Sequence, residues 1–385
     1  MREVPGAFSG PAVKLRVERI ELRLLKMPLR FRFETSFGAV SETSFLLARL
    51  FTAEGASGIG ECVAEEHPYY LPETNGTVAH VIKEFLAPLL LGRTFESPEE
   101  TDALFAAIRG HEMAKAALEM AIWDLFANAK GEPLWKTLGG EAKPSIPAGV
   151  SIGLQPSVSA LLERVRVEVA AGYQRIKIKI KPGKDVDLVR AIRKEFPKIQ
   201  LMVDANSAYT LADADTLRAF DEFDLMMIEQ PLAWNDIIEH SLLQPLIETP
   251  VCLDESITSD AAARSALSIG ACRIINIKAG RVGGLLNSKR IQATAGERGK
   301  AVWCGGMLES GIGRLANVHL QTLPGFTLPG DTSASARYFE EDLIEPGVTV
   351  DGNGLIQVPG GPGLGHEIVW PRVEKATVHR EVWAT

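Results

Sequence analysis

Five polar residues recur at an almost constant interval through the middle of the chain, and each stands at the end of a short apolar run. They are Lys179, Asp204, Glu229, Asp254 and Lys278, separated by 25, 25, 25 and 24 residues. Each interval holds a strand-like run followed by a helical pattern. A repeat of about two dozen residues with this content is typical of βα units in a barrel, whose strands all end at one mouth. The spacing therefore predicts that two lysines and three carboxylates share one site.

Length and composition set the limits of this prediction. The 385 residues leave room for a barrel of about 250 residues and a second domain. The formal net charge of −8 argues against a general nucleic-acid surface, and no uncharged apolar window is long enough to span a membrane. Residues 1–27 contain no continuous apolar core of the kind found in secretory signals. We expect a cytoplasmic protein that binds neither nucleic acid nor membranes.

The cysteines and histidines are not assigned to chemistry. The four cysteines lie in separate strand-like runs without CxxC pairing, so we expect reduced thiols in the core. The seven histidines are far apart in the sequence and show no metal-binding spacing.

The first part of the chain predicts an α+β domain over residues 1–143. Residues 13–24 alternate apolar and charged, and the alternation slips near Glu18, which indicates a β-bulge or two strands. Strand-like runs at 43–52 and 58–63 follow, and then helical patterns over 76–91, 98–109 and 113–129. Strands followed by helices are typical of an α+β unit.

From residue 144 the pattern becomes a strict alternation of short strands and helices, which predicts a parallel α/β barrel over 144–342. We place its eight strands near 146–151, 174–180, 200–204, 225–229, 250–254, 272–278, 301–304 and 326–330. Residues 343–385 are rich in glycine and proline at their start. We expect this tail to return to the first domain.

The second barrel strand carries a row of cations. Arg175, Lys177, Lys179 and Lys181 share one parity and isoleucines share the other. In isolation this pattern indicates a strand with a solvated cationic face. In a barrel the apolar parity faces the helices, so Lys177 and Lys179 would point inward, where buried cations need carboxylate partners.

Asp204, Glu229 and Asp254 supply such partners and form a candidate metal site. Any one of them alone would be read as a helix cap or a surface residue, but three in register argue against that. Hard oxygen ligands without histidine or thiolate suit Mg²⁺, with Mn²⁺ or another divalent cation as a substitute. Glu255 could support these ligands from behind, and Asn206 could hold a metal-bound water or cap a helix.

Lys179 and Lys278 end the second and sixth strands, so in an eight-stranded barrel they lie on opposite sides of the metal ligands. This geometry suits removal of a proton from one face of a carbon and its return to the other. A lysine base must be neutral near pH 7. Lys177 and Arg281 would lower the pKa of these lysines, whereas nearby carboxylates would raise it, and the sequence leaves the balance open.

The chain resembles the enolase superfamily, and most closely its o-succinylbenzoate synthase / N-acylamino acid racemase branch. The resemblance is carried by FRFETSFG (31–38), KIKIKPG (177–183), VDANSAYT (203–210), IEQPLAW (228–234), CLDES (252–256), WCGGMLESGIGR (303–314) and GDTSAS (330–335). It implies a (β/α)7β barrel preceded by a capping domain that supplies specificity. It also implies a homo-oligomer.

By this resemblance the residues match family roles. Asp204, Glu229 and Asp254 match the metal ligands, and Lys179 and Lys278 match the acid/base pair. Lys177 matches the first lysine of the family's KxK motif, and Arg281 stands where members with racemase activity carry arginine. Candidates for the lid are Phe33, Phe37 and Tyr70, and candidates for an acyl pocket are Gly305, Gly306 and Met307, although a tight turn explains the glycines equally well.

These residues favour metal-dependent abstraction of the α-proton of a small carboxylate substrate through an enediolate, as in an N-acylamino acid (N-succinylamino acid) racemase in which the two lysines exchange roles. The alternative within the branch is o-succinylbenzoate synthase, a syn dehydration in menaquinone synthesis, with Lys179 as base and then acid. Some members of the branch do both, and Arg281 favours the racemase. A barrel that only binds metal and ligand is disfavoured, because it would not need two opposed buried lysines.

Overall fold

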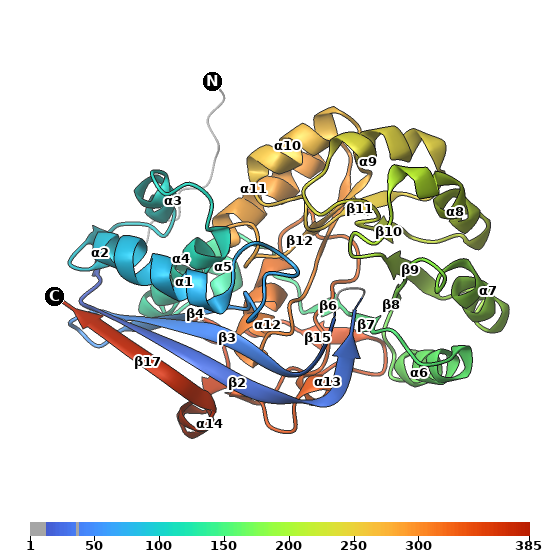
Figure 1. Ribbon diagram of the computed structural model, residues 1–385. Coiled ribbons are helices and arrows are strands. Elements are labelled where there is room, and N and C mark those ends of the chain that lie inside the picture. The colour runs from blue at the N-terminus through green and yellow to red at the C-terminus, as the bar shows by residue number, and fades with distance from the viewer. Residues whose placement is uncertain (1–12, 36–37) are drawn as a thin grey trace.

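Two bodies lie side by side in the computed structural model, which describes residues 13–35 and 38–385. The predicted lid residue Phe37 lies outside these residues. In Figure 1 a sheet of long strands with its helices stands beside a curved row of alternating strands and helices. No helix in the described part of the chain is long and apolar enough to cross a membrane.

The first body is built on an antiparallel sheet in the order β17-β2-β3-β4. Its strands are β2 (Arg19–Glu34), β3 (Ala39–Phe51), β4 (Ser57–Cys62) and β17 (Thr377–Ala384), while β1 (Leu15–Arg16) pairs separately with β5 (Thr94–Phe95). The chain leaves β1 and starts β2 across Val17 and Glu18, which confirms the two-strand reading of the slip in alternation.

Helices cover one face of this sheet. They are α1 (Asn75–Val81), the π-helical turn η1 (Ile82–Leu86), α2 (Ala87–Leu90), α3 (Glu100–Phe105), α4 (Glu112–Lys130) and α5 (Leu134–Leu138). The long helix α4 packs directly on β4, where Gly58 and Gly60 allow the close approach. A Cβ atom at Gly58 would lie 2.2 Å from the carbonyl oxygen of Ala121, so no larger residue fits there.

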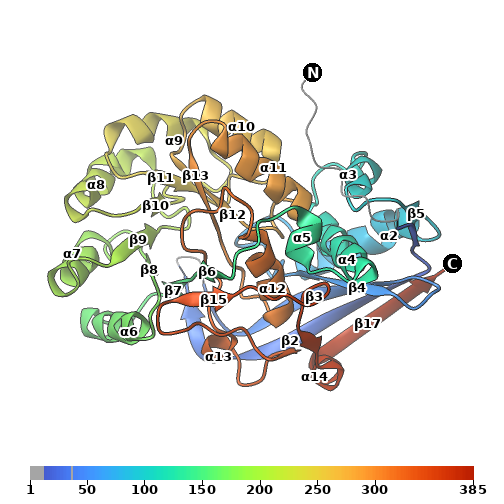
Figure 2. The ribbon, with the colours of Figure 1, turned by 180° about the vertical axis from the view of Figure 1, so that it is seen from behind.

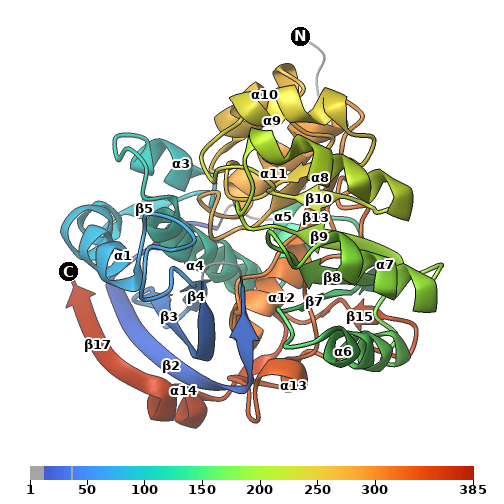
Figure 3. The ribbon, with the colours of Figure 1, turned by 45° about the vertical axis from the view of Figure 1, so that its right-hand side comes forward.

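The second body is a curled parallel sheet with consecutive strand order from β7 to β13. Its strands are β7 (Gly149–Ile152), β8 (Arg175–Lys179), β9 (Gln200–Asp204), β10 (Ile228–Glu229), β11 (Val251–Leu253), β12 (Ile274–Ile277) and β13 (Ala301–Cys304). The helical segments between and after them are α6 (Val158–Ala170), α7 (Val186–Glu195), η2 (Leu211–Asp213), α8 (Ala214–Arg218), η3 (Ala219–Phe223), α9 (Ile238–Leu243), η4 (Gln244–Leu246), α10 (Asp260–Ser268), α11 (Leu285–Gly296) and α12 (Gly311–Leu320). Figure 3 shows these helices on the outside of the strands.

The predicted eighth strand at 326–330 is wrong as a regular strand. This segment makes single parallel bridges, Phe326 to Val302 on one edge of the sheet and Gly330 to Ala148 on the other. Pro329 has no N–H to donate, so it interrupts the ladder that a strand would need. The segment therefore occupies the eighth place and links both edges without forming a strand.

The end of the chain returns to the first body. It contains α13 (Ser335–Tyr338), β14 (Ile344–Glu345), β15 (Leu355–Gln357), β16 (Glu367–Ile368) and α14 (Trp370–Ala376) before β17. The strand β15 pairs with β6 (Ser145–Pro147), and β17 runs antiparallel along β2. Figure 2 shows β17 at the edge of the long-stranded sheet, beside β2. The limits 1–143, 144–342 and 343–385 stay predictions.

Candidate active site

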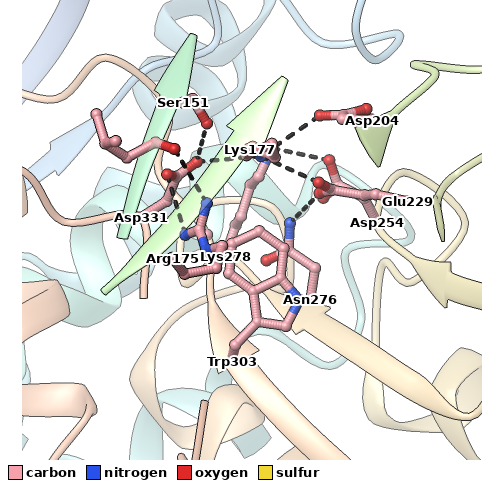
Figure 4. A network of polar contacts seen from close by, with 12 residues as sticks. Ser151, Arg175, Lys177, Asp204, Glu229, Asp254, Asn276, Lys278, Trp303 and Asp331 are labelled. Atoms are coloured by element: carbon pink, nitrogen blue, oxygen red, sulfur yellow. Dashed lines mark hydrogen bonds and ion pairs between the residues drawn. The ribbon is translucent and has the colours of Figure 1, made fainter. Parts of the chain in front are cut away.

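The strand register brings the spaced residues to one end of the curled sheet. Lys179 pairs with Asp204, and Asp204 pairs with Glu229, across β8, β9 and β10. Glu229 pairs with Cys252 on β11, so Asp254 lies two residues beyond the same level. All three carboxylates are buried, and Figure 4 shows them gathered beside Lys177. The even spacing in sequence thus corresponds to neighbouring strand ends in space.

Lys179 lies between two groups on the loop after β9. Its Nζ donates to Asp204 Oδ2 and to Asn206 Oδ1, both at 2.6 Å. Asn206 has a left-handed backbone with φ 41° and donates through Nδ2 to Glu255 Oε1 at 3.1 Å. Asn206 therefore fixes the position of Lys179 Nζ, and Glu255 in turn fixes Asn206.

Lys177 is held by carboxylates on three sides. Its Nζ lies 3.0 Å from Glu229 Oε2, 3.4 Å from Asp204 Oδ2 and 3.0 Å from Asp331 Oδ2. Burial disfavours the charged ammonium, but Asp331, Glu229 and Asp204 outweigh it and raise the pKa of Lys177 above its ordinary value. Lys177 is therefore a fixed cation beneath the site.

Asp331 is a site residue that the sequence analysis missed. It follows the 326–330 segment and also accepts from Arg175 Nη2 at 3.1 Å and from Ser151 Oγ at 2.6 Å (Figure 4). Burial opposes its ionisation, yet Lys177 and Arg175 prevail and hold the pKa of Asp331 well below its usual range. The GDTSAS stretch contained this residue, but only closure of the barrel brings it beside β8.

Lys278, on the far side, shares its partners with Arg281. The Nζ of Lys278 donates to Asp254 Oδ2 and to the Tyr70 hydroxyl, each at 2.9 Å. Arg281 Nη1 donates to Asp254 Oδ1 and, at 3.1 Å, to the same hydroxyl. Tyr70, a predicted lid residue, in turn donates to Asp254 Oδ1 at 3.0 Å. It reaches the barrel from the capping domain.

These contacts determine whether the pKa of Lys278 is raised or lowered, which the sequence left open. Burial disfavours its charge, but Tyr70, Glu229 and Glu255 outweigh burial and raise the pKa of Lys278. Arg281, the cation that was expected to lower this pKa, is itself paired with Asp254. The lysine is thus an ammonium ion in this arrangement.

Two buried oxygens of the site lack a hydrogen-bond partner among the described residues. They are Glu255 Oε2 and Asn276 Oδ1. Burial and the charge of Asp204 raise the pKa of Glu255 to about 7. Asn276, which the sequence analysis missed, donates through Nδ2 to Glu229 Oε1 at 2.6 Å.

The donor set fits a divalent cation in its chemistry. Three carboxylates lie at or just after the ends of neighbouring strands, a further buried carboxylate oxygen is unsatisfied nearby, and hard oxygen ligands suit such ions. Within the described residues, however, no group of three or more histidine, cysteine or acidic side chains has a ligating arrangement. The carboxylates instead bind the lysines and Arg281, so cation binding would require these side chains to move.

A cavity of about 410 Å³ opens above these residues, between the barrel and the capping domain. Lys177 and Lys179 line it from β8, Asn206 and Lys278 from the segments just after β9 and β12, and Gly306 and Met307 from the loop after β13. The capping domain contributes Phe33 and Tyr70. Gly305 does not appear among the described lining residues and packs on Asn276 instead, because a Cβ there would lie 2.3 Å from Asn276 Oδ1.

Known family models match both bodies of the structure. Residues 160–372 match the family model described as Enolase C-terminal domain-like, and residues 19–139 match that of the mandelate racemase / muconate lactonizing enzyme N-terminal domain. The chain belongs to the enolase superfamily. Enzymes of this superfamily use a divalent cation with lysine or histidine bases.

Full-length relatives narrow the branch within the enolase superfamily. The chain is 54% identical over 363 residues to an o-succinylbenzoate synthase of Geobacillus kaustophilus, covering 94% of this chain and 96% of that one. It is 47% identical over 364 residues to an N-succinylamino acid racemase of Thermus thermophilus, covering 94% and 98%. A solved enolase-superfamily protein from Listeria innocua superposes with a TM-score of 0.93 at 42% identity, covering 96% and 99%.

Proposed function

We propose that this enzyme abstracts the α-proton of an N-acylamino acid and racemises it, with N-succinylamino acids as substrates. The observation that carries the proposal is the position of Lys179 and Lys278. Lys179 ends β8 and Lys278 directly follows β12, the three carboxylate strands lie between them in the sheet order, and both lysines line one cavity. A substrate α-carbon in that cavity would have one amine on each face.

In this proposal Lys179 takes the proton on one face and Lys278 returns it on the other, and the roles reverse with direction. Asn206 orients Lys179, and Tyr70 orients Lys278. Asp204, Glu229 and Asp254 would hold Mg²⁺, whose charge, when bound, stabilises the enediolate. A solved dipeptide epimerase from Cytophaga hutchinsonii, 25% identical, is a complex with Mg, which supports this choice of cation.

Arg314 is the proposed partner of the succinyl carboxylate. It is buried on α12, lines the cavity, and has no carboxylate partner among the described residues. Its Nε donates to the Glu309 carbonyl at 2.9 Å and its Nη1 to the Ser333 carbonyl at 2.7 Å. A buried guanidinium without a carboxylate is a ready site for an anion.

A second candidate reaction is the o-succinylbenzoate synthase dehydration, the activity named for the Geobacillus relative. The ion pair of Lys278 with Asp254 at 2.9 Å favours it, because that reaction needs Lys278 only as a charge that stabilises the enolate. Lys179 would then serve as base and as acid. In that role the enzyme would act in menaquinone synthesis in the cytoplasm, and one site could catalyse both reactions.

Proton exchange tests the proposal directly. N-succinyl-L-phenylalanine is followed by proton NMR in D₂O with the protein and Mg²⁺, while chiral analysis tracks the D-enantiomer. Loss of the α-proton signal with formation of the D-enantiomer is expected. A persistent signal would exclude racemisation of this substrate and leave the dehydration as the leading reaction.

Replacing Lys278 separates the candidates. We expect Lys278→Ala to abolish racemisation and to reduce dehydration, whereas a protein that only binds would keep its affinity for the ligand. Lys194→Ala, on the exposed side of α7, is the matched control and should keep full activity. Normal racemisation by Lys278→Ala would show that the two-base assignment is wrong.

A further inference from the structure

Glu65 is a charged residue of the cavity wall to which the proposed reaction gives no role. It follows β4 in the capping domain and lines the same cavity as Lys179 and Lys278. Its backbone has φ 63°, a left-handed conformation that is uncommon for residues other than glycine. The Asn75 N–H donates to the Glu65 carbonyl at 2.8 Å, and Asn75 Nδ2 donates to the Ser44 carbonyl at 3.0 Å. The capping domain thus fixes the turn that presents Glu65 to the cavity.

The other acidic side chains of the wall are already engaged. Glu66 and Glu42 are ion-paired with Lys26, Asp331 is paired with Lys177 and Arg175, and Glu309 accepts from the Met307 N–H and from Asn317. The Glu65 carboxylate, by contrast, makes no hydrogen bond or ion pair with any residue that the structure describes. Among the described residues that line the cavity, Glu65 is therefore the carboxylate that a ligand could pair with.

Electrostatics agree with this assignment. Burial raises the pKa of Glu65, and the charges of Lys278 and Lys179 offset only part of that effect. Both lysines are therefore close enough to influence Glu65 without pairing with it. A carboxylate in such surroundings gains most from a cation that arrives with the substrate.

The geometry of the proposed reaction indicates which part of the substrate would carry that cation. The α-carbon would lie between Lys179 and Lys278, with its carboxylate toward the strand ends. The acyl group and the amino acid side chain must then face the loop after β13 and the capping domain. Arg314 offers a cation on the loop side, which suits an anionic acyl group, and Glu65 offers an anion on the capping-domain side.

We propose that Glu65 selects N-acylamino acids with a cationic side chain, such as lysine or arginine derivatives, by pairing with the ammonium or guanidinium group. This inference rests on the proposed function for the orientation of the substrate. Glu65 could also accept a hydrogen bond from the amide N–H of the substrate. Every N-acylamino acid has that amide, however, so only a contact with the side chain would discriminate between substrates.

Equilibrium binding tests the assignment. Isothermal titration calorimetry with the full chain and Mg²⁺ compares N-succinyl-L-arginine with N-succinyl-L-citrulline, which has nearly the same shape without the charge. We expect the wild type to bind the arginine derivative roughly tenfold more tightly, the scale of a charged hydrogen bond. In Glu65→Gln the two ligands should bind equally, with the citrulline affinity unchanged. Glu66→Gln, the neighbouring carboxylate already paired with Lys26, is the matched control and should keep the preference.

Three outcomes would overturn the assignment: equal affinities in the wild type, an equal loss for both ligands in Glu65→Gln, or loss of the preference in Glu66→Gln as well. Proton exchange of the same two ligands is measured in parallel. A preference for arginine without exchange would refute the racemase and leave Glu65 as the selecting residue. Proton exchange without a preference for arginine would support the racemase and refute the role of Glu65.

Discussion

Asp331→Asn tests how much the pairing of one carboxylate with the cations Arg175 and Lys177 on β8 contributes to the free energy of unfolding. The side chains of Asp331, Arg175 and Lys177 are only 8%, 1% and 3% exposed. Asparagine keeps the volume and can still accept from Ser151 Oγ, but it removes the negative charge. Lys177 retains Glu229 and Asp204 as carboxylate partners. Arg175 keeps no carboxylate partner among the described residues, but it keeps the Pro329 and Val150 carbonyls, at 3.4 Å, and the face of the Trp303 ring. The cost therefore falls mainly on Arg175.

Breaking a buried pair by removing one partner costs about 3–5 kcal/mol. Because Lys177 keeps other partners, we expect the lower end, about 3 kcal/mol, a large part of the stability of an ordinary domain. Guanidinium unfolding followed by circular dichroism and by tryptophan fluorescence measures it, and the free energy is taken only where the two transitions coincide. Asp187→Asn, which breaks the exposed pair with Arg190, is the control and should change stability by less than about 1 kcal/mol.

The pH dependence gives a second check. The pKa of Asp331 is lowered in the folded state, so its contribution is present above the unfolded pKa of about 3.9 and is lost as pH falls further. The difference between wild type and Asp331→Asn should thus be constant above about pH 4 and shrink below it. A loss no larger than that of Asp187→Asn would refute the reasoning.

Three further perturbations address the site and the docking of the two bodies. Arg281→Ala should abolish racemisation while dehydration is less affected, because Lys278 loses the guanidinium that contacts the same Asp254 and Tyr70 side chains. Equal losses of the two activities would argue against a selective effect of Arg281 on Lys278. Arg314→Met should lower kcat/KM for N-succinyl substrates at least about tenfold more than for N-acetyl ones, and a uniform loss would indicate a purely structural role. Glu119 caps the start of α11 from α4, and burial raises its pKa to about 7. Its raised pKa contributes stability below about pH 4.3 that is lost as pH rises to about 7, roughly 4 kcal/mol in all. Denaturation at pH 4.5 and at pH 8 should therefore show a smaller loss of stability with rising pH in Glu119→Gln than in the wild type.

The sequence by itself determined the arrangement of the barrel strands and of the residues at their ends. The period of about two dozen residues follows from the length of one βα unit, so Lys179, Asp204 and Glu229 had to reach neighbouring positions once the units were wound. The two strands at the start of the capping domain and the helix over 113–129 were likewise local patterns, and the observed β1, β2 and α4 match them.

Only the tertiary structure decided which distant residues complete the site. Tyr70 reaches Lys278 across 208 residues of sequence, and Asp331 reaches Arg175 across 156, so neither contact leaves a local pattern. The eighth barrel place is filled without a strand, because single bridges to both edges suffice when Pro329 interrupts the ladder. The charge state of Lys278 also depends on packing, since burial and the carboxylates act in opposite directions and only the folded chain sets their distances. A local run of residues predicts its own strand or helix, whereas the position of the capping domain on the barrel determines which side chains face the lysines.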